Sequence, residues 1–206
     1  MVIVKDGIIY AVALAAAGEL IAWLTGPWFA APLWLLAAFC LYFFRDPERV
    51  VPEGPVAVSP ADGKVVAVQP DAPGINRISI FLNIFDVHVN RTPIGGSIAK
   101  VQYQCGAFHV ASREECSTQN EQNVVTVQGE GTTVVFKQIA GLIARRIVFD
   151  KKPGDHVETG ERIGLIKFGS RMDVLFGPEW DIVVKPGMRV SAGSSIIARR
   201  RDGGRS

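Results

Sequence analysis

The stretch that decides the fold is KPGDHVETGERIG, residues 152–164, because it recurs as KPGMRVSAGSSII at residues 185–197. Both copies follow the pattern KPGxxVxxGxxI, and they lie 33 positions apart. Pro-Gly is typical of a turn, and the second glycine permits the positive φ that often precedes a new strand. The repeat therefore predicts two copies of one strand–turn–strand unit.

Short β-branched runs surround this repeat from residue 50 onward. They include 65–68 (VVAV), 77–81 (RISIF), 124–127 (VVTV), 132–136 (TTVVF) and 181–184 (DIVV), separated by Gly, Pro and Asp. This spacing predicts a mainly-β sandwich or barrel. Only 138–149 is ambiguous between helix and strand.

With SPADGKV at 59–65, the repeat resembles lipoyl- and biotinyl-carrier domains, which implies a barrel-sandwich-hybrid-like fold. The hairpin region between the repeats lacks the displayed lysine that a carrier needs.

Two apolar runs precede this part, at 7–24 and 28–44, with Gly26-Pro27 between them. As helices they would extend about 27 Å and 25 Å, near the lower limit for crossing a bilayer core. We expect residues 1–49 to form a membrane-associating helical hairpin and residues 50–206 the β-rich domain. Lys5, Arg45 and Arg49 flank the runs, so the positive-inside rule places both ends and the β-rich domain in the cytoplasm, at the cell membrane. A signal peptide and an interfacial hairpin are the alternatives, and Glu19 favours the latter.

The totals exclude several functions. Lys and Arg number 22 against 20 Asp and Glu, which predicts no nucleic-acid partner. The three cysteines have no CxxC spacing, so we expect no metal site and no disulfide framework.

The segment KFGSR, residues 167–171, places Gly169-Ser170 between two strand-like runs. Such a pair is ordinarily a turn. It also suits self-cleavage: the Ser170 hydroxyl attacks the Gly169 carbonyl, the amide becomes an ester, and β-elimination leaves a dehydroalanine that hydrolyses to a pyruvoyl group. Glycine tolerates the close approach, and serine supplies the β-oxygen leaving group.

Three stretches together resemble the phosphatidylserine decarboxylase proenzymes in their short form. They are FGSR at 168–171, SPADGKV around Asp62, and FLNIFDVHVNRTP around His88, followed by Gly95-Gly96 and Lys100-Val101. The order of these motifs and the N-terminal hydrophobic segment agree as well, so that the resemblance covers nearly all of residues 1–198.

The resemblance implies a membrane-bound lyase of phospholipid biosynthesis, made as a zymogen. Autocatalytic cleavage at Gly169-Ser170 would give a β chain, 1–169, and an α chain, 170–206, which stay associated. The pyruvoyl cofactor, derived from Ser170, would form a Schiff base with phosphatidylserine and release CO2 to leave phosphatidylethanolamine. A homo-oligomer is compatible with the sequence.

The same resemblance assigns an Asp62–His88–Ser170 arrangement, in which Asp62 orients the imidazole and His88 is the base. Longer family members carry a second histidine three residues after the first, whereas this chain has Arg91. Whether His88 serves both cleavage and decarboxylation is left open. We also assign substrate-binding roles to Arg91 and His109.

Taken singly, these residues have ordinary explanations. Asp62 suits a turn, His88 a polar strand position, Arg91 a structural ion pair and His109 loop or core packing. The alternative function is a non-catalytic, membrane-anchored, carrier-like β-sandwich adaptor. A third hypothesis keeps the chemistry and changes the substrate to another serine-headgroup lipid or an amino acid.

Overall fold

The computed structural model describes residues 2–106, 116–141, 146–167 and 169–201. The chain divides into two compact units, residues 1–48 and 49–206, and each is considered by itself.

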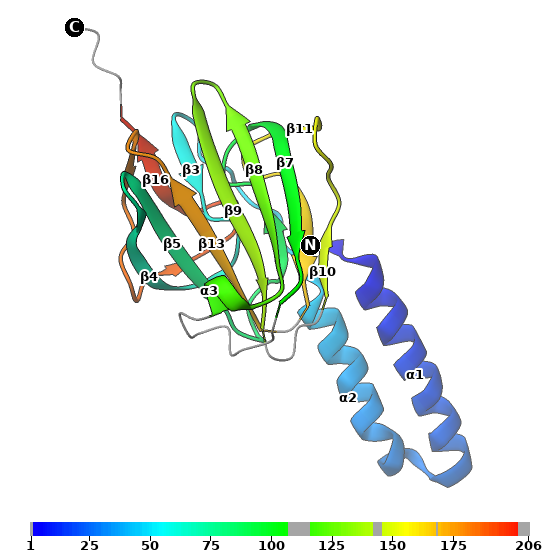
Figure 1. The fold of residues 1–206 in the computed structure, drawn as a ribbon. Coiled ribbons are helices and arrows are strands. Elements are labelled where there is room, and N and C mark those ends of the chain that lie inside the picture. Colours follow the sequence, from blue (N-terminus) through cyan, green and yellow to red (C-terminus); the bar gives the residue numbers. More distant parts are fainter. Residues whose placement is uncertain (1, 107–115, 142–145, 168, 202–206) are drawn as a thin grey trace, which may run out of the picture. The chain divides into compact units, whose positions relative to one another are not determined.

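The first unit is a helical hairpin. Helix α1 (Lys5–Thr25) and helix α2 (Pro27–Phe43) are joined at Gly26, whose φ of 108° suits only glycine, and Pro27 takes the first position of α2. Strands β1 (Val2–Ile3) and β2 (Arg45–Asp46) pair antiparallel at the open end (Figure 1). The predicted break at Gly26-Pro27 is confirmed.

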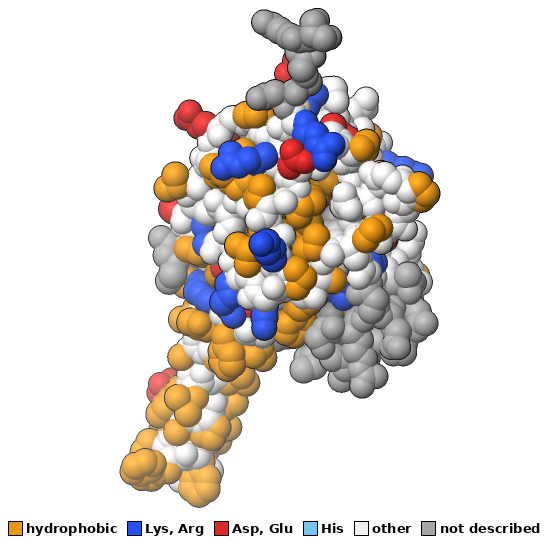
Figure 2. Space-filling view, turned by 90° about the vertical axis from the view of Figure 1, so that its left-hand side faces the viewer, with side chains coloured by type: hydrophobic (Ala, Val, Ile, Leu, Met, Phe, Trp, Pro, Cys, Tyr) orange, Lys and Arg blue, Asp and Glu red, His pale blue; other side chains and the backbone are white. Residues whose placement is uncertain are grey.

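Small residues line the face of α1 that packs against α2. Gly7, Ala11 and Gly18 are buried, and a Cβ atom at Gly18 would lie 2.6 Å from Nε1 of Trp34. Small side chains let two helix backbones approach closely, as they do between helices in membranes. The outward faces are apolar, with Trp23 and Trp28 at 81% and 87% exposure, and Figure 2 shows hydrophobic side chains along the hairpin. By length and composition, α1 alone could cross a membrane; α2 is shorter.

The second unit consists of three antiparallel sheets, which confirms the mainly-β prediction (Figure 1). The large sheet has the order β11-β7-β8-β9-β13-β5-β4-β15, and the two small sheets have the orders β10-β12-β6 and β14-β16-β3. The strands are β3 (Val56–Val58), β4 (Gly63–Ala72), β5 (Ile75–Leu82), β6 (Val89–Arg91), β7 (Gly96–Gln104), β8 (Gln122–Gly129), β9 (Thr132–Ala140), β10 (Ile147–Phe149), β11 (His156–Val157), β12 (Arg162–Ile166), β13 (Ser170–Phe176), β14 (Trp180–Ile182), β15 (Arg189–Val190) and β16 (Ile196–Arg200); a short helix, α3 (Cys116–Gln119), precedes β8.

The strand order has an internal twofold pattern. The large sheet reads the same from either end when β4 is exchanged with β7, β5 with β8, β13 with β9 and β15 with β11. Exchanging β10 with β14, β12 with β16 and β6 with β3 likewise turns one small sheet into the other. Several of the equivalent pairs keep the 33-residue spacing of the repeat: β3 and β6 begin at 56 and 89, β4 and β7 at 63 and 96, and β11 and β15 at 156 and 189. The sequence repeat is therefore one part of an internal twofold arrangement of the strands, and the pseudo-twofold axis of this arrangement passes between β9 and β13.

Reciprocal backbone hydrogen bonds support this symmetry. Val58 N donates to the carbonyl of Pro93 at 2.9 Å, and Arg91 N donates to the carbonyl of Pro60 at 2.9 Å. The turn glycines behave alike, because Gly160 N donates to Thr92 and Gly193 N donates to Ser59. Both halves enclose one apolar core formed by side chains such as Val65, Ile80, Val125, Phe136 and Val174.

The strand predictions hold over most of their length. In the ambiguous segment 138–149, residues 138–140 belong to β9 and residues 147–149 to β10. The predicted strand 181–184 is shorter and ends at Ile182.

Gly96 lies where strands β7 and β8 approach each other closely. Its φ is 149°, and a Cβ atom there would lie 2.3 Å from the carbonyl oxygen of Gln128 on the paired strand. We expect Gly96→Ala to lower the free energy of unfolding by about 2–4 kcal/mol, because strain and a backbone clash combine. Thermal unfolding of the detergent-solubilised chain would measure it, with Ser97→Ala, at an exposed neighbour, as the control. Equal melting temperatures for the two variants would contradict this account.

Candidate active site around the Gly169–Ser170 bond

Ser170 begins β13 in the interior of the large sheet. It pairs with Leu82 on β5 and with Ala140 on β9, and its exposure is 0%. It shares its strand face with Met172 and Val174, which belong to the core, so its side chain faces the same interior. Among the described residues, its Oγ has no hydrogen-bond partner. A buried hydroxyl left in this way costs about 1–3 kcal/mol, and such a group calls for an explanation.

Gly169 precedes it in the left-handed conformation, with φ of 61°. Strand β12 ends at Ile166 in a small sheet and β13 begins at Ser170 in the large one, so the connection passes between sheets. A Cβ atom at Gly169 would meet nothing within 4 Å. A side chain would thus have space here, and it is the left-handed backbone conformation that requires glycine.

His88 lies beside this bond and is 2% exposed. The amide of Gly169 donates to its Nε2 at 3.4 Å, and its Nδ1 lies 2.9 Å from the carbonyl oxygen of Asp86. An amide can only donate and a carbonyl can only accept, so Nδ1 carries the proton and Nε2 presents a lone pair. His88 Nε2 thus accepts from the amide that lies one residue before the Gly169–Ser170 bond.

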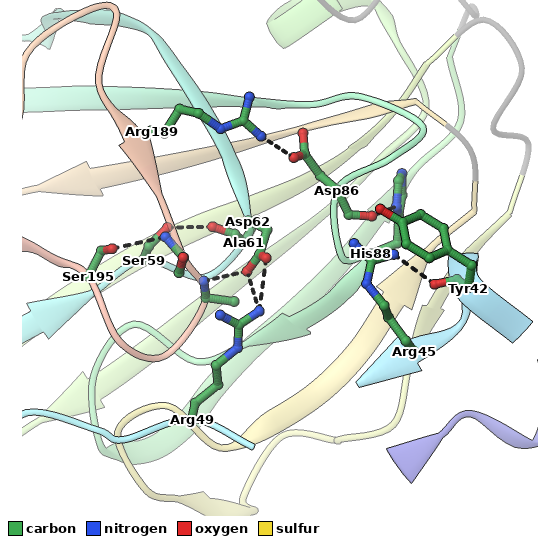
Figure 3. Close-up of polar contacts among 12 residues, drawn as sticks. Tyr42, Arg45, Arg49, Ser59, Ala61, Asp62, Asp86, His88, Arg189 and Ser195 are labelled. Carbon is green, nitrogen blue, oxygen red and sulfur yellow. Dashed lines mark hydrogen bonds and ion pairs between the residues drawn. The ribbon is translucent and has the colours of Figure 1, made fainter. Parts of the chain in front are cut away.

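The Asp86 carbonyl is held in place through the side chain of the same residue. The Asp86 carboxylate forms an ion pair with Arg189 and accepts a hydrogen bond from Asn83 N at 2.9 Å (Figure 3). These two contacts fix the turn that precedes His88, and with it the tautomer of the imidazole.

Asp62 has other partners. Its carboxylate accepts two hydrogen bonds from Arg49 Nη2, at 2.8 and 2.9 Å, and one from Ala192 N at 2.8 Å (Figure 3). In the described part of the chain, no hydrogen bond joins Asp62 to His88. The structure therefore brings His88 to the amide of Gly169, the residue before Ser170, while the predicted roles of His88 and Asp62 stay predictions.

The two proposed substrate-binding residues are Arg91 and His109. Arg91 is buried, and its Nη1 donates to the carbonyl of Gly160 at 3.0 Å. Its stem packs against Gly193, where a Cβ atom would lie 2.8 Å from Cδ of Arg91. His109 lies outside the described residues.

The sequence assigns no site role to Arg49, Asp86, Asn90 or Gln138. Arg49 lies thirteen positions before Asp62, and that spacing gives no signal of their pairing. The alternation of Asp86, His88 and Asn90 predicts that they share one face, but it does not identify their contacts. No group of His, Cys, Asp and Glu suited to a metal ion occurs among the described residues.

The fold and the site thus place a Gly–Ser pair beside a buried histidine, in a β-rich unit that follows an apolar hairpin in the sequence. The family model for phosphatidylserine decarboxylase matches residues 36–198. The chain belongs to the phosphatidylserine decarboxylase family. A phosphatidylserine decarboxylase proenzyme from Solibacter usitatus is 76% identical over 98% of both chains. Proenzymes of the same name from Cupriavidus taiwanensis and Burkholderia cenocepacia are each 44% identical, over 84% of both chains for the first, and over 96% of this chain and 95% of the relative for the second.

Proposed function

We propose that this protein decarboxylates phosphatidylserine to phosphatidylethanolamine, using a pyruvoyl group that it makes from Ser170 by cleaving its own Gly169–Ser170 bond. The observation that carries the proposal is the contact of His88 Nε2 with the Gly169 amide at 3.4 Å, next in sequence to a buried Ser170 whose hydroxyl has no partner among the described residues. The relatives named phosphatidylserine decarboxylase proenzyme support the substrate.

Self-cleavage follows from what these residues can do. His88 Nε2 takes the proton of Ser170 Oγ, and the oxygen bonds to the carbonyl carbon of Gly169. The C–N bond then breaks, the Ser170 nitrogen takes the proton from His88, and an ester joins the two residues. Loss of the Ser170 α-proton breaks the Cβ–Oγ bond, which frees the Gly169 carboxylate and leaves dehydroalanine. One water enters and one ammonia leaves to give the pyruvoyl end.

The residues around Ser170 fit such a group. The position is buried and starts a strand that is paired on both sides, so the new chain end stays fixed after cleavage. The group supplies a carbonyl that condenses with the substrate amine and accepts the electrons left by the departing carboxylate. We propose that His88 Nε2 takes up a proton and returns it during decarboxylation, that Asp62 contributes negative charge, and that Arg91 and His109 bind the substrate.

The two products of cleavage would remain one folded unit. Strand β13 opens the α chain and pairs with β5 and β9, while β14, β15 and β16 pair with one another or with β-chain strands β3 and β4. The pairing of β13 from Arg171 onward and of the three later strands does not depend on the Gly169–Ser170 bond.

A lipid substrate agrees with the apolar surface of the hairpin. Its exposed side chains, among them Ile9, Leu20, Trp23 and Phe29, suit a bilayer better than water. We propose that the hairpin holds the protein at the cell membrane and that the β-rich unit lies on the cytoplasmic side.

The mass of the purified protein tests the proposal first. We expect two chains, 1–169 and 170–206, the smaller one blocked to Edman degradation, and conversion of phosphatidylserine to phosphatidylethanolamine in mixed micelles. Ser170→Ala should leave the proenzyme whole, and His88→Ala should slow cleavage by about 10²–10⁴-fold, the usual contribution of a general base. An intact single chain in active preparations would contradict the proposed self-cleavage, and an intact chain without decarboxylase activity would support the adaptor instead.

Asp62 and Arg49 can be separated by paired variants. If Asp62 stabilises the charged imidazole, Asp62→Asn should slow cleavage by at least about tenfold, and Arg49→Gln should leave cleavage much nearer to wild type. Both variants should lower the melting temperature, because each breaks the same partly buried ion pair. Time courses of cleavage by gel, with melting temperatures alongside, would measure both effects. Equal slowing would mean that Asp62 acts only through its contact with Arg49.

Cys105 tests the orientation of the β-rich unit. Among the three free cysteines it alone is exposed, while Cys40 and Cys116 are buried. A membrane-impermeant maleimide should therefore label Cys105 in inverted membrane vesicles and leave it unlabelled in intact spheroplasts. Cys105→Ser is the control for labelling at the other two cysteines. Equal labelling in both preparations would contradict a cytoplasmic location.

A further inference from the structure

We infer that Asn90 is a further catalytic residue: its side-chain amide donates a hydrogen bond to the oxygen of the Gly169 carbonyl while Ser170 attacks it. This inference rests on the proposed self-cleavage and assigns one part of it. Asn90 is 0% exposed, and its Nδ2 is a buried donor with no partner among the described residues. Leaving such a donor unpaired costs about 1–3 kcal/mol, unless another state of the protein uses it.

The orientation of the Asn90 amide is set by its neighbour Gln138. Gln138 Nε2 lies 3.4 Å from the carbonyl oxygen of Val148, which can only accept, so that end of Gln138 must be the nitrogen. The same nitrogen donates to Asn90 Oδ1 at 2.9 Å, and Gln138 Oε1 accepts from Asn123 Nδ2 at 3.1 Å. Asn90 therefore turns its oxygen to Gln138 and keeps its NH2 group for something else.

Asn90 lies on the same face of the chain as His88, which contacts Gly169. His88 and Asn90 are two residues apart where the chain is extended, with Val89 paired to Leu165 and the His88 carbonyl bonded to Ile166 N, so they share one face. His88 reaches the Gly169 amide from that face. Asn90, from the same face, reaches Gln138.

Gln138 in turn lies next to Ser170. It pairs directly with Met172, and Ser170 pairs with Ala140, so Gln138 and Ser170 are diagonal neighbours. Diagonal neighbours across an antiparallel pair are about 7–8 Å apart at Cα, and both face the core here. The buried amide of Asn90 and the buried hydroxyl of Ser170, both without partners among the described residues, thus face one interior.

The chemistry needs a donor at this point. When Ser170 Oγ bonds to the Gly169 carbon, the carbonyl electron pair moves to oxygen, and the proton of Ser170 passes to His88. In this scheme, neither His88 nor Ser170 donates a hydrogen bond to the resulting oxyanion. A fixed neutral donor in a site without water stabilises such a charge and transfers no proton itself. Asn90 supplies this donor.

Two substitutions remove the donor and differ in volume: Asn90→Leu and Asn90→Ala. Each should slow cleavage by about 10²–10³-fold, the loss found when one oxyanion donor is removed. Gln122→Leu is the matched control. Gln122 is also a buried side-chain amide on the large sheet, and its Oε1 has no partner among the described residues. It is next in sequence to Asn123, which faces the core, so the Gln122 side chain faces the opposite side of the sheet. The control should cleave at the wild-type rate. Pulse-labelled proenzyme followed by intact mass would give the rates, and melting temperatures would show that each variant is folded.

Hydroxylamine separates this role from a structural one, because it cleaves an ester but not an amide. If Asn90 acts in ester formation, hydroxylamine should not restore cleavage of the Asn90 variants, whereas it should release Gly169 as a hydroxamate from wild-type proenzyme during maturation. Wild-type cleavage rates in a folded Asn90 variant, equal slowing in Gln122→Leu, or hydroxylamine-sensitive ester in the Asn90 variants would each overturn the inference. A wild-type chain that never splits at 169/170 would instead overturn the proposed function.

Discussion

The pairing of β13 with both β5 and β9 is the constraint on which the site depends. A strand that is hydrogen-bonded on both sides cannot shift by one residue without turning every side chain to the opposite face. Met172, Val174 and Phe176 fill the core from this strand, so their burial fixes the register. Ser170, which shares their face, is then held inside the fold although its hydroxyl gains no partner among the described residues. Burial of these apolar side chains thus holds the Ser170 hydroxyl in the core, although its position there lowers the stability of the fold.

The internal twofold pattern explains how this strand comes to its position. The two KPGxxVxxGxxI units add β11 and β15 at opposite ends of the large sheet, and β12 and β16 to the two small sheets. The site breaks the symmetry. Asp62 accepts a hydrogen bond from Ala192 N, whereas its counterpart, Gly95, donates through its own amide to Thr159 Oγ1. One half therefore presents a carboxylate, held by Arg49, where the other half has none.

Burial also decides the state of His88 and its neighbours. Between an amide donor and a carbonyl acceptor, the imidazole has one arrangement that satisfies both, with the proton on Nδ1. The ion pair of Asp86 with Arg189 links this arrangement to β15, a strand of the second repeat. The repeat and the site are thus connected through a charged contact as well as through the core.

The sequence by itself determined the local structure. Glycine and proline turns, β-branched runs and two apolar stretches are properties of neighbouring residues, and they predicted the hairpin, most of the strands and the repeat. The importance of Gly169, Ser170 and His88 came from a resemblance carried by their motifs. Only the tertiary structure decided which groups meet. Arg49 with Asp62, His88 with Gly169, and Asn90 with Gln138 are brought together by the tertiary fold across 13, 81 and 48 residues, and no local pattern encodes such contacts.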